Sequence, residues 1–226
     1  MHRYFHHEID RVQQKLLTMG SMVEDRVRKA CSVIESGDVG MAKKLIKSDW
    51  EIDELEIEIE EECLKIMALH QPVARDLRFL VTIIKINSEM ERIGDYAALI
   101  AKRVKKISKF DSPALSFNFH EMTDKVMVEL KMSIDALVDR SVEEAKQIFT
   151  LDHEVNAMRS KGYKMIIKEM NRSPEHTTSL LNFYLVVRHL ERIADRATNI
   201  AEDVIYMVEG DIVRKKLDFD QELEGN

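Results

Sequence analysis

The chain has 226 residues with a formal net charge of −7, and it contains only 7 glycines and 3 prolines although 33% of its residues are charged. So few turn-forming residues disfavour a β-protein. The negative charge argues against nucleic acid as a partner, because phosphate binding needs a basic surface.

The cysteines and the apolar runs indicate the cellular compartment in which we expect the protein. Cys31 and Cys63 lack C-x-x-C spacing, no apolar run reaches 18 residues, and the start has no signal-peptide core. A reduced cytoplasm is the expected compartment. We expect contact with a membrane only through a partner protein.

The first three predicted helices lie between residue 1 and residue 109. An apolar stripe from Phe5 to Ala30 marks the first helix, and the second runs from about Val39 to Leu69. The third begins near Pro72, since proline is favoured in the first turn of a helix. Its apolar residues alternate in steps of three and four, as in the seam of a left-handed helical bundle. They are Ile83, Ile86, Met90, Ile93, Ala97, Ile100, Val104 and Ile107.

The rest of the chain repeats this organisation after a linker at residues 110–114. A first stripe runs from Met122 to Leu137, a second helix from about Val142 to Met170, and a third helix begins near Pro174. The seam of this last helix matches the earlier one at every position. It consists of Phe183, Val186, Leu190, Ile193, Ala197, Ile200, Val204 and Met207.

An internal duplication explains this match. The sequence therefore predicts an all-α protein made of two tandem three-helix bundles, six long helices in total. The first bundle covers residues 1–109 and the second covers residues 117–210. Residues 211–226 form a charged tail, which we expect to fray.

Paired acidic residues recur at equivalent points of the two halves, four residues apart on one helical face. We expect the third-helix pairs to lie off the seam and open to solvent. Carboxylates at this density repel one another unless a cation lies between them, and Mg²⁺, Mn²⁺ and iron suit oxygen ligands. The alternative interpretation is a merely solvated acidic surface. The candidate metal ligands are Asp49, Asp53, Glu91 and Asp95 in the first half, and Asp152, Asn156, Glu191 and Asp195 in the second.

The arginines that follow the two glutamates have two interpretations. Arg92 and Arg192 either orient a carboxylate or form surface ion pairs. The sequence contains no P-loop, no G-x-S-x-G, no Glu-x-x-His and no evident nucleophile with a base. Nothing in it argues for an enzyme.

The segments around these residues resemble the PhoU family over nearly the whole chain. The resemblance rests on H-Q-P-V-A-R-D-L-R at 70–78, E-R-I-G-D at 91–95 and H-L-E-R-I-A-D at 189–195. It implies two three-helix bundles and metal clusters held by pairs of E(D)-x-x-x-D motifs. It also implies a non-enzymatic negative regulator acting between the Pst phosphate ABC transporter and the sensor histidine kinase of the Pho regulon.

Transferred position by position, the motif pairs are the eight candidate ligands already named. Asn156 departs from the acidic pattern and lowers the charge of the second set by one. The resemblance implies one or several ions of iron, manganese, magnesium or zinc, and it is compatible with a homodimer. Two alternatives stay open, which are a metal-dependent phosphate-ester hydrolase using the same carboxylates and a purely structural helical scaffold.

Overall fold

The structure is a computed structural model that describes residues 2–111, 113 and 115–213. Within these residues the chain forms helices and no strands, which confirms the predicted all-α class. The helices are α1 (His2–Ser36), α2 (Val39–Lys47), α3 (Trp50–His70), α4 (Ala74–Ile107), α5 (Phe119–Asp139), α6 (Val142–Arg172), the short 3-10 helix η1 (Pro174–His176) and α7 (Thr177–Glu209).

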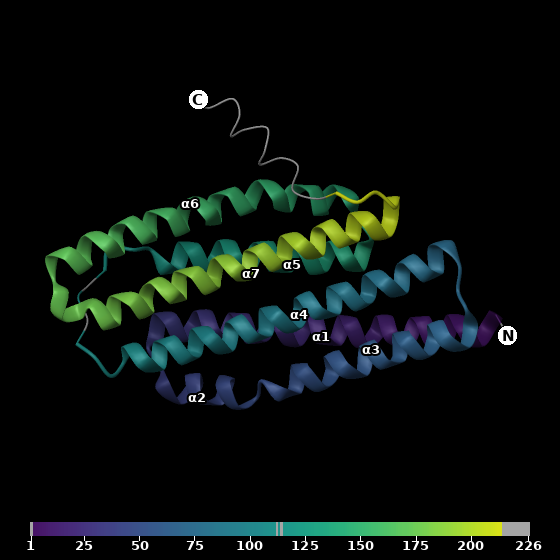
Figure 1. The fold of residues 1–226 in the computed structure, drawn as a ribbon, viewed down its shortest axis with the longest axis horizontal. Helices are drawn as coiled ribbons and strands as arrows, with labels where there is room; N and C mark the ends of the chain where they lie inside the picture. Colours follow the sequence, from purple (N-terminus) through teal and green to yellow (C-terminus); the bar gives the residue numbers. More distant parts are fainter. Residues whose placement is uncertain (1, 112, 114, 214–226) are drawn as a thin grey trace, which may run out of the picture.

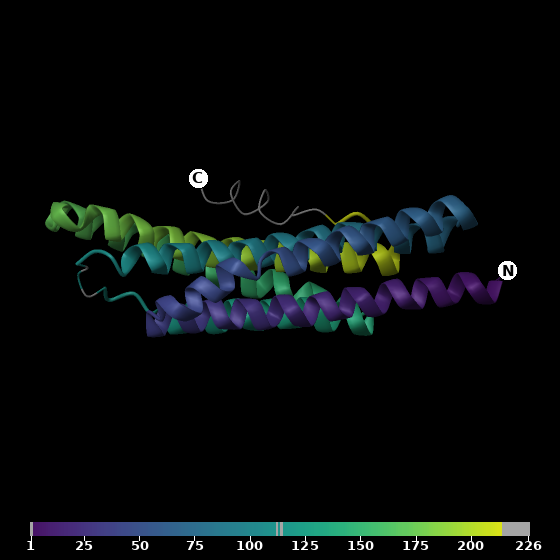
Figure 2. The same ribbon diagram turned by 90° about the horizontal axis from the view of Figure 1, so that it is seen from below.

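The long helices form two layers. In Figure 1, α6, α7, α4 and α3 lie side by side from top to bottom, and Figure 2 shows α1 and α5 together against one face of that layer. The equivalent helices α4 and α7 are therefore neighbours at the centre of the molecule. The two bundles are confirmed, and they are joined along their third helices rather than strung end to end.

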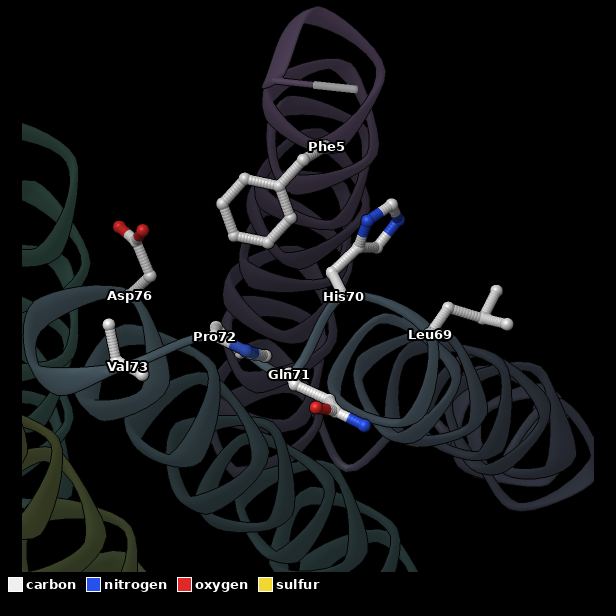
Figure 3. Close-up of a pocket in the computed structure, with 7 residues that line it drawn as sticks. All are labelled: Phe5, Leu69, His70, Gln71, Pro72, Val73 and Asp76. Atoms are coloured by element: carbon white, nitrogen blue, oxygen red, sulfur yellow. The ribbon is translucent and has the colours of Figure 1, made fainter.

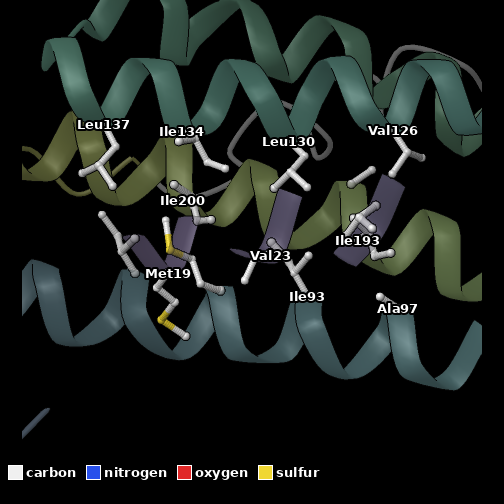
Figure 4. Close-up of a cluster of buried hydrophobic side chains, with 14 of the residues drawn as sticks. Met19, Val23, Ile93, Ala97, Val126, Leu130, Ile134, Leu137, Ile193 and Ile200 are labelled. Atoms are coloured by element: carbon white, nitrogen blue, oxygen red, sulfur yellow. The ribbon is translucent and has the colours of Figure 1, made fainter. Parts of the chain in front are cut away.

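One hydrophobic core runs through both bundles. Figure 4 shows side chains from α1, α4, α5 and α7 pointing toward one another, among them Met19, Ile93, Leu130 and Ile193. Both predicted seams are buried except for their outermost residues, Ile107 and Phe183, which are half-buried. Each fully buried Leu or Ile contributes roughly 1.5–3 kcal/mol, so burial of the seams fixes how the two halves pack.

The second predicted helix is not continuous, although the six-helix organisation is confirmed, with α2 and α3 together in the place of one predicted helix. α2 ends at Lys47 and α3 begins at Trp50. The buried Arg26 side chain of α1 compensates for the break. Its Nη2 donates to the carbonyl oxygen of Leu45 at 2.7 Å, and its Nη1 donates to that of Ser48 at 2.8 Å. The same carbonyls also accept longer hydrogen bonds, from Ser48 Oγ at 3.4 Å and from the backbone N–H of Glu51 at 3.3 Å, so Arg26 strengthens a weakly bonded helix end.

The equivalent helix of the second half, α6, is unbroken as predicted. Ser141 precedes it, and its Oγ accepts a hydrogen bond from the backbone N–H of Glu144 at 3.2 Å, which caps the start of the helix. Pro72 and Pro174 each lie before the third helix of their half rather than in the first turn of that helix. α4 begins at Ala74, and Pro174 starts the 3-10 turn before α7.

The predicted linker and tail fall at the edges of the described residues. Both predicted bundle boundaries, 109 and 117, lie between the end of α4 and the start of α5. Residues 112 and 114 of the linker lie outside the described residues, as do residues 214–226 of the predicted tail. α7 ends at Glu209 and is followed by Gly210, whose φ of 86° is the left-handed conformation that glycine adopts readily.

Candidate functional site

The first half gathers its predicted ligands where α3 lies against α4. Gly94 makes this approach close, because a Cβ atom there would stand 2.9 Å from Cδ1 of Ile52. The carboxylates on either side interact electrostatically. We call the group the first acidic cluster, and it comprises Asp49, Asp53, Glu56, Glu91 and Asp95.

Asp49 lies at the break between α2 and α3, beside the same arginine that compensates for that break. Arg26 Nη2 lies 2.8 Å from Asp49 Oδ1. Burial raises the pKa of Asp49, Arg26 opposes this effect, and Asp95 and Asp53 raise the pKa further. Sequence reasoning missed Arg26, because its position on α1 gave no sign of the carbonyls and the carboxylate that it binds.

Glu91 carries the largest pKa shift in this cluster. Burial raises its pKa to about 7, the charges of Asp95, Glu56 and Asp53 add to the shift, and Arg92 opposes it. The expectation that Glu91 is open to solvent is therefore wrong, because α3 packs beside it, whereas Asp95 is exposed as expected. A proton or another cation is favoured at this carboxylate near neutral pH.

Glu56 was not among the predicted ligands. It lies on α3 one turn beyond Asp53, and burial raises its pKa, with Glu60 and Asp53 contributing. Asp53 and Glu56 are three residues apart and therefore share a face of α3, which could have suggested Glu56 as a ligand. So many residues of α3 are acidic, however, that this spacing alone selects none of them.

The second half has the equivalent residues Asp152, Asn156, Glu191 and Asp195 on α6 and α7, which we call the second acidic cluster. Asp152 is only 5% exposed. Asn156 Nδ2 donates a hydrogen bond to Asp152 Oδ2 at 2.9 Å. The amide that replaces an acidic residue thus stabilises its neighbour directly.

Arginines neutralise this second cluster from its own helices. Arg196 Nη2 lies 2.7 Å from Asp195 Oδ2, and Arg159 Nε lies 3.8 Å from Glu191 Oε1. Arg192 reaches Asp195 at 3.4 Å and Glu191 at 3.8 Å, so it orients carboxylates.

The first half lacks Arg159 and Arg196 at the corresponding positions, although it keeps Arg92 at the position of Arg192. Arg159 lies 103 residues after Glu56, the spacing that relates Asp152 to Asp49, and Arg196 lies 100 residues after Tyr96. Arg92 is exposed, and its ion-pair partner is Glu89 at 4.0 Å. A surface ion pair is therefore the interpretation that fits Arg92.

The buried arginine of the first half has an acidic counterpart in the second. Glu129 of α5 lies 103 residues after Arg26 and is fully buried. Sequence reasoning missed Glu129 because it stands within an apolar stripe. The two halves thus share their acidic pairs but exchange the sign of the charge that α1 and α5 contribute.

Polar contacts between α4 and α7 connect the two halves. Glu89 accepts hydrogen bonds from Arg196 Nη1 and Asn199 Nδ2, both at 3.1 Å. Lys85 Nζ lies 2.7 Å from Asp203 Oδ1. Since Arg196 also binds Asp195, one guanidinium joins the second cluster to the first bundle.

The segment at residues 70–78, which carries part of the resemblance to the PhoU family, lies away from the acidic clusters, at the turn between α3 and α4 and in the first residues of α4. Gln71 and Ala74 both adopt positive φ, 46° and 45°, and His70 Nε2 lies 2.6 Å from the Glu8 carboxylate. Glu91 is about 25 Å further along α4. A cleft of about 560 Å³ opens here (Figure 3), lined by Phe5, Leu69, His70, Gln71, Pro72, Val73 and Asp76.

The donor chemistry of the first acidic cluster fits a hard cation, since its candidate ligands are carboxylate oxygens. Across the described part of the chain, no group of three or more His, Cys, Asp or Glu side chains is arranged to hold an ion as it stands. The eight predicted ligands therefore stay a prediction.

None of the helices that the structure describes is long and apolar enough to cross a membrane.

Both halves match the same family model. The model, described as the PhoU domain, matches residues 16–104 and again residues 119–204. The chain is 32% identical over 209 residues to the phosphate-specific transport system accessory protein PhoU homolog of Clostridium acetobutylicum, covering 92% of this chain and 95% of that protein. It is 30% identical to the phosphate-specific transport system accessory protein PhoU of Escherichia coli K12, covering 91% and 86%.

Solved structures are similar over the same extent. The crystal structure of PhoU from Pseudomonas aeruginosa superimposes with a TM-score of 0.88 at 32% identity, covering 92% of this chain and all of that one. The phosphate transport system regulatory protein PhoU from Streptococcus pneumoniae gives a TM-score of 0.83 at 27% identity, covering 93% and 99%.

Proposed function

The chain belongs to the PhoU family, and we propose that it acts as an accessory and regulatory protein of phosphate transport. The observation that carries this proposal is the match of both halves, over nearly the full length, to relatives that bear this name. More specifically, the protein is a non-enzymatic negative regulator. It acts as an adaptor in the cytoplasm between the Pst phosphate ABC transporter and the Pho-regulon sensor histidine kinase.

Metal binding is the second part of the proposal. The first acidic cluster would hold an iron, manganese, magnesium or zinc ion through Asp49, Asp53, Glu91 and Asp95. When bound, the ion supplies positive charge that cancels the repulsion among these carboxylates. The chain's own contribution is to hold α3 and α4 together at Gly94, so that the ligands of both helices face the same ion.

The second acidic cluster would bind a cation more weakly. Asn156 contributes one negative charge less than Asp53, and Arg159, Arg192 and Arg196 already neutralise the carboxylates of α7. An incoming ion would have to displace these arginines. The proposed sites therefore differ in affinity although the repeat gives them the same helices.

The adaptor role sets a constraint on how the signal passes. An acidic helical surface without a Gly-rich loop is poorly suited to bind phosphate itself. We expect the transporter to sense phosphate and this protein to report the transporter's state through different affinities for its conformations. Titration calorimetry with phosphate on metal-free protein should show no binding. Tight phosphate binding without a detectable protein partner would identify a direct sensor instead.

Gene deletion tests the regulatory role. A strain lacking this protein should express phosphate-starvation genes when phosphate is plentiful, and a plasmid copy of the wild-type gene should restore repression. A reporter fused to a starvation promoter measures both effects. Normal repression in the deletion strain would contradict the proposal.

A phosphatase assay separates the adaptor from the hydrolase alternative. Purified protein loaded in turn with Mg²⁺, Mn²⁺, Zn²⁺ and iron should not turn over a phosphate ester. Turnover that disappears in the Glu91→Ala variant would assign catalysis to the first acidic cluster and refute the adaptor role.

A further inference from the structure

Large apolar side chains are exposed along the outer face of α3. Trp50, Ile57 and Leu64 are 55%, 55% and 52% exposed and follow one another at intervals of seven residues. Seven residues are nearly two turns, so the three side chains form a line with steps of about 10.5 Å. We call this line the α3 stripe. It lies opposite the buried Ile59 and Ile66, and therefore faces away from the core.

Carboxylates surround the α3 stripe. Glu54 and Glu61 lie between its apolar residues, and both are exposed. Lys15 pairs with Glu58 and Glu62 where α3 meets α1, whereas no ion pair joins Glu54 or Glu61 to another described residue. The only basic residue among the stripe's neighbours on α3 is Lys65. The acidic residues of the helix are Glu51, Asp53, Glu54, Glu56, Glu58, Glu60, Glu61 and Glu62.

The repeat indicates that packing of the bundle does not require this stripe. The positions of Trp50 and Ile57 correspond to His153 and Ser160 of α6, 103 residues later, and that of Glu61 corresponds to Lys164. Only the position of Leu64 keeps an exposed apolar residue, Ile167, so α6 has one of the three apolar contacts of the stripe. Both helices lie at the edges of the same layer, α3 at the bottom and α6 at the top of Figure 1. α3 packs on α1 and α4, which leaves its outer face uncovered.

We propose that the α3 stripe is a docking surface for a basic amphipathic helix of a partner protein. Such a helix would place apolar residues at heptad spacing alongside Trp50, Ile57 and Leu64, as in a two-helix coiled coil. Its lysines and arginines would pair with Glu54 and Glu61. Tryptophan is among the residues that most often dominate binding energy at interfaces.

Charge complementarity selects this occupant over a second copy of the chain. Two α3 stripes facing each other would bring like charges together, which disfavours association. The outer face of α6 carries Lys161 and Lys164, but it presents His153 and Ser160 where apolar contacts are needed. The proposal goes beyond the proposed function, since it requires neither a metal ion nor any particular partner of the phosphate system.

The single tryptophan of the chain makes the surface directly observable. Trp50 is that residue, so fluorescence excited selectively at tryptophan, away from the absorption of the 5 tyrosines, reports on the stripe. The probe is a tryptophan-free peptide of three heptads, with leucine on one face and lysine on both sides of it. Titration into the full-length protein should produce a saturable blue shift of the emission. Added salt should weaken the binding, because it screens the carboxylates.

Paired variants separate docking from general attraction between opposite charges. Ile57→Ser with Leu64→Ser should lower the affinity about tenfold or more, since each removes an apolar anchor. Glu54→Lys with Glu61→Lys should lower it as well. Val128→Ser with Val138→Ser removes apolar residues of similar exposure on α5 and should leave the affinity unchanged. Circular dichroism checks that each variant is folded.

Three outcomes would overturn the proposal. A peptide with the same composition in scrambled order could bind equally well, which would reduce the effect to charge. The peptide could leave the Trp50 emission unchanged, which would place binding elsewhere. Emission could shift with protein concentration alone and stop doing so in a Lys161→Glu/Lys164→Glu variant, which would identify a second copy as the occupant.

Discussion

The two halves of the molecule place acidic pairs on the same helices and balance their charge differently. In the first half, a buried arginine comes from α1, where Arg26 binds Asp49 and the carbonyls at the helix break. In the second half, the arginines come from α6 and α7, and the position of Arg26 holds the buried Glu129. The duplication has kept the overall helix arrangement and most of the carboxylates, although α6 is unbroken and Asn156 replaces an acidic residue, while the counter-charges have diverged.

This difference predicts which of the two acidic clusters binds a cation more strongly. The second acidic cluster already has Arg159 and Arg196, which the first half replaces by Glu56 and Tyr96. The first acidic cluster instead holds Glu91 with a pKa raised to about 7. We expect a proton or a metal ion to add positive charge there, so the two proposed sites differ through charge rather than through fold.

Removing Arg26 should have the largest effect on stability. Arg26→Met leaves the carbonyls of Leu45 and Ser48 and the carboxylate of Asp49 without this partner in a buried environment. The expected cost is about 3 kcal/mol in the free energy of unfolding, measured by urea denaturation. Arg28→Met, which removes an exposed arginine two residues away, should cost less than about 0.5 kcal/mol. Equal stability of both variants would refute the role assigned to Arg26.

Exchanging counter-charges should make the second half behave like the first. Arg159→Glu with Arg196→Tyr removes the two arginines and installs the residues of the first half. We expect the affinity of the second acidic cluster for Mn²⁺ to rise about tenfold, because the incoming ion no longer displaces arginines. Calorimetric titration of the Glu91→Ala/Asp95→Ala background isolates this site. An unchanged affinity would show that the arginines do not set the difference between the halves.

In metal-free protein, Glu91 should make the free energy of unfolding depend on pH. Its folded pKa of about 7 lies above the ordinary value of 4.5, so the native state binds the proton more tightly. The resulting stabilisation is complete below about pH 4.5 and is lost as pH rises through about 7. Glu91→Gln should abolish this loss, about 1–2 kcal/mol after allowance for solvent screening, in urea unfolding at pH 5 and pH 8.

Glu191→Gln is the matched control for that experiment. Burial raises the pKa of Glu191 too, but Arg192 and Arg159 oppose the shift, so its effect on the pH profile should be smaller. A larger effect from Glu191→Gln than from Glu91→Gln would contradict the claim that arginines neutralise the second acidic cluster more than the first.

Substitutions in the α3 stripe should have the smallest effect on folding. Ile57→Ser and Leu64→Ser replace side chains that are already more than half exposed, so each should change the free energy of unfolding by less than about 0.5 kcal/mol. Thermal denaturation measures this directly. A clear loss of stability would indicate that the stripe packs within this chain.

Periodicity was sufficient to predict the helical class, the duplication and most helix boundaries, because each seam repeats its spacing for many turns. The break before Asp49 could not be predicted. It depends on Arg26, which is 23 residues away in sequence and binds the broken segment only after α1 and α2 pack. The pairing of arginines with the cluster carboxylates could not be predicted for the same reason, since Arg159 meets Glu191 only where α6 packs against α7.

Metal content tests the difference between the halves most directly. Wild-type protein, Glu91→Ala/Asp95→Ala and Glu191→Ala/Asp195→Ala should be dialysed together against limiting Mn²⁺ and their bound metal measured by mass spectrometry. Since these residues bury little apolar surface, each variant should keep its helicity by circular dichroism. The first double variant should lose most of the bound metal, and the second should retain most of it. Equal losses, or unchanged stoichiometry in the first double variant, would contradict the assignment of the stronger site to the first acidic cluster.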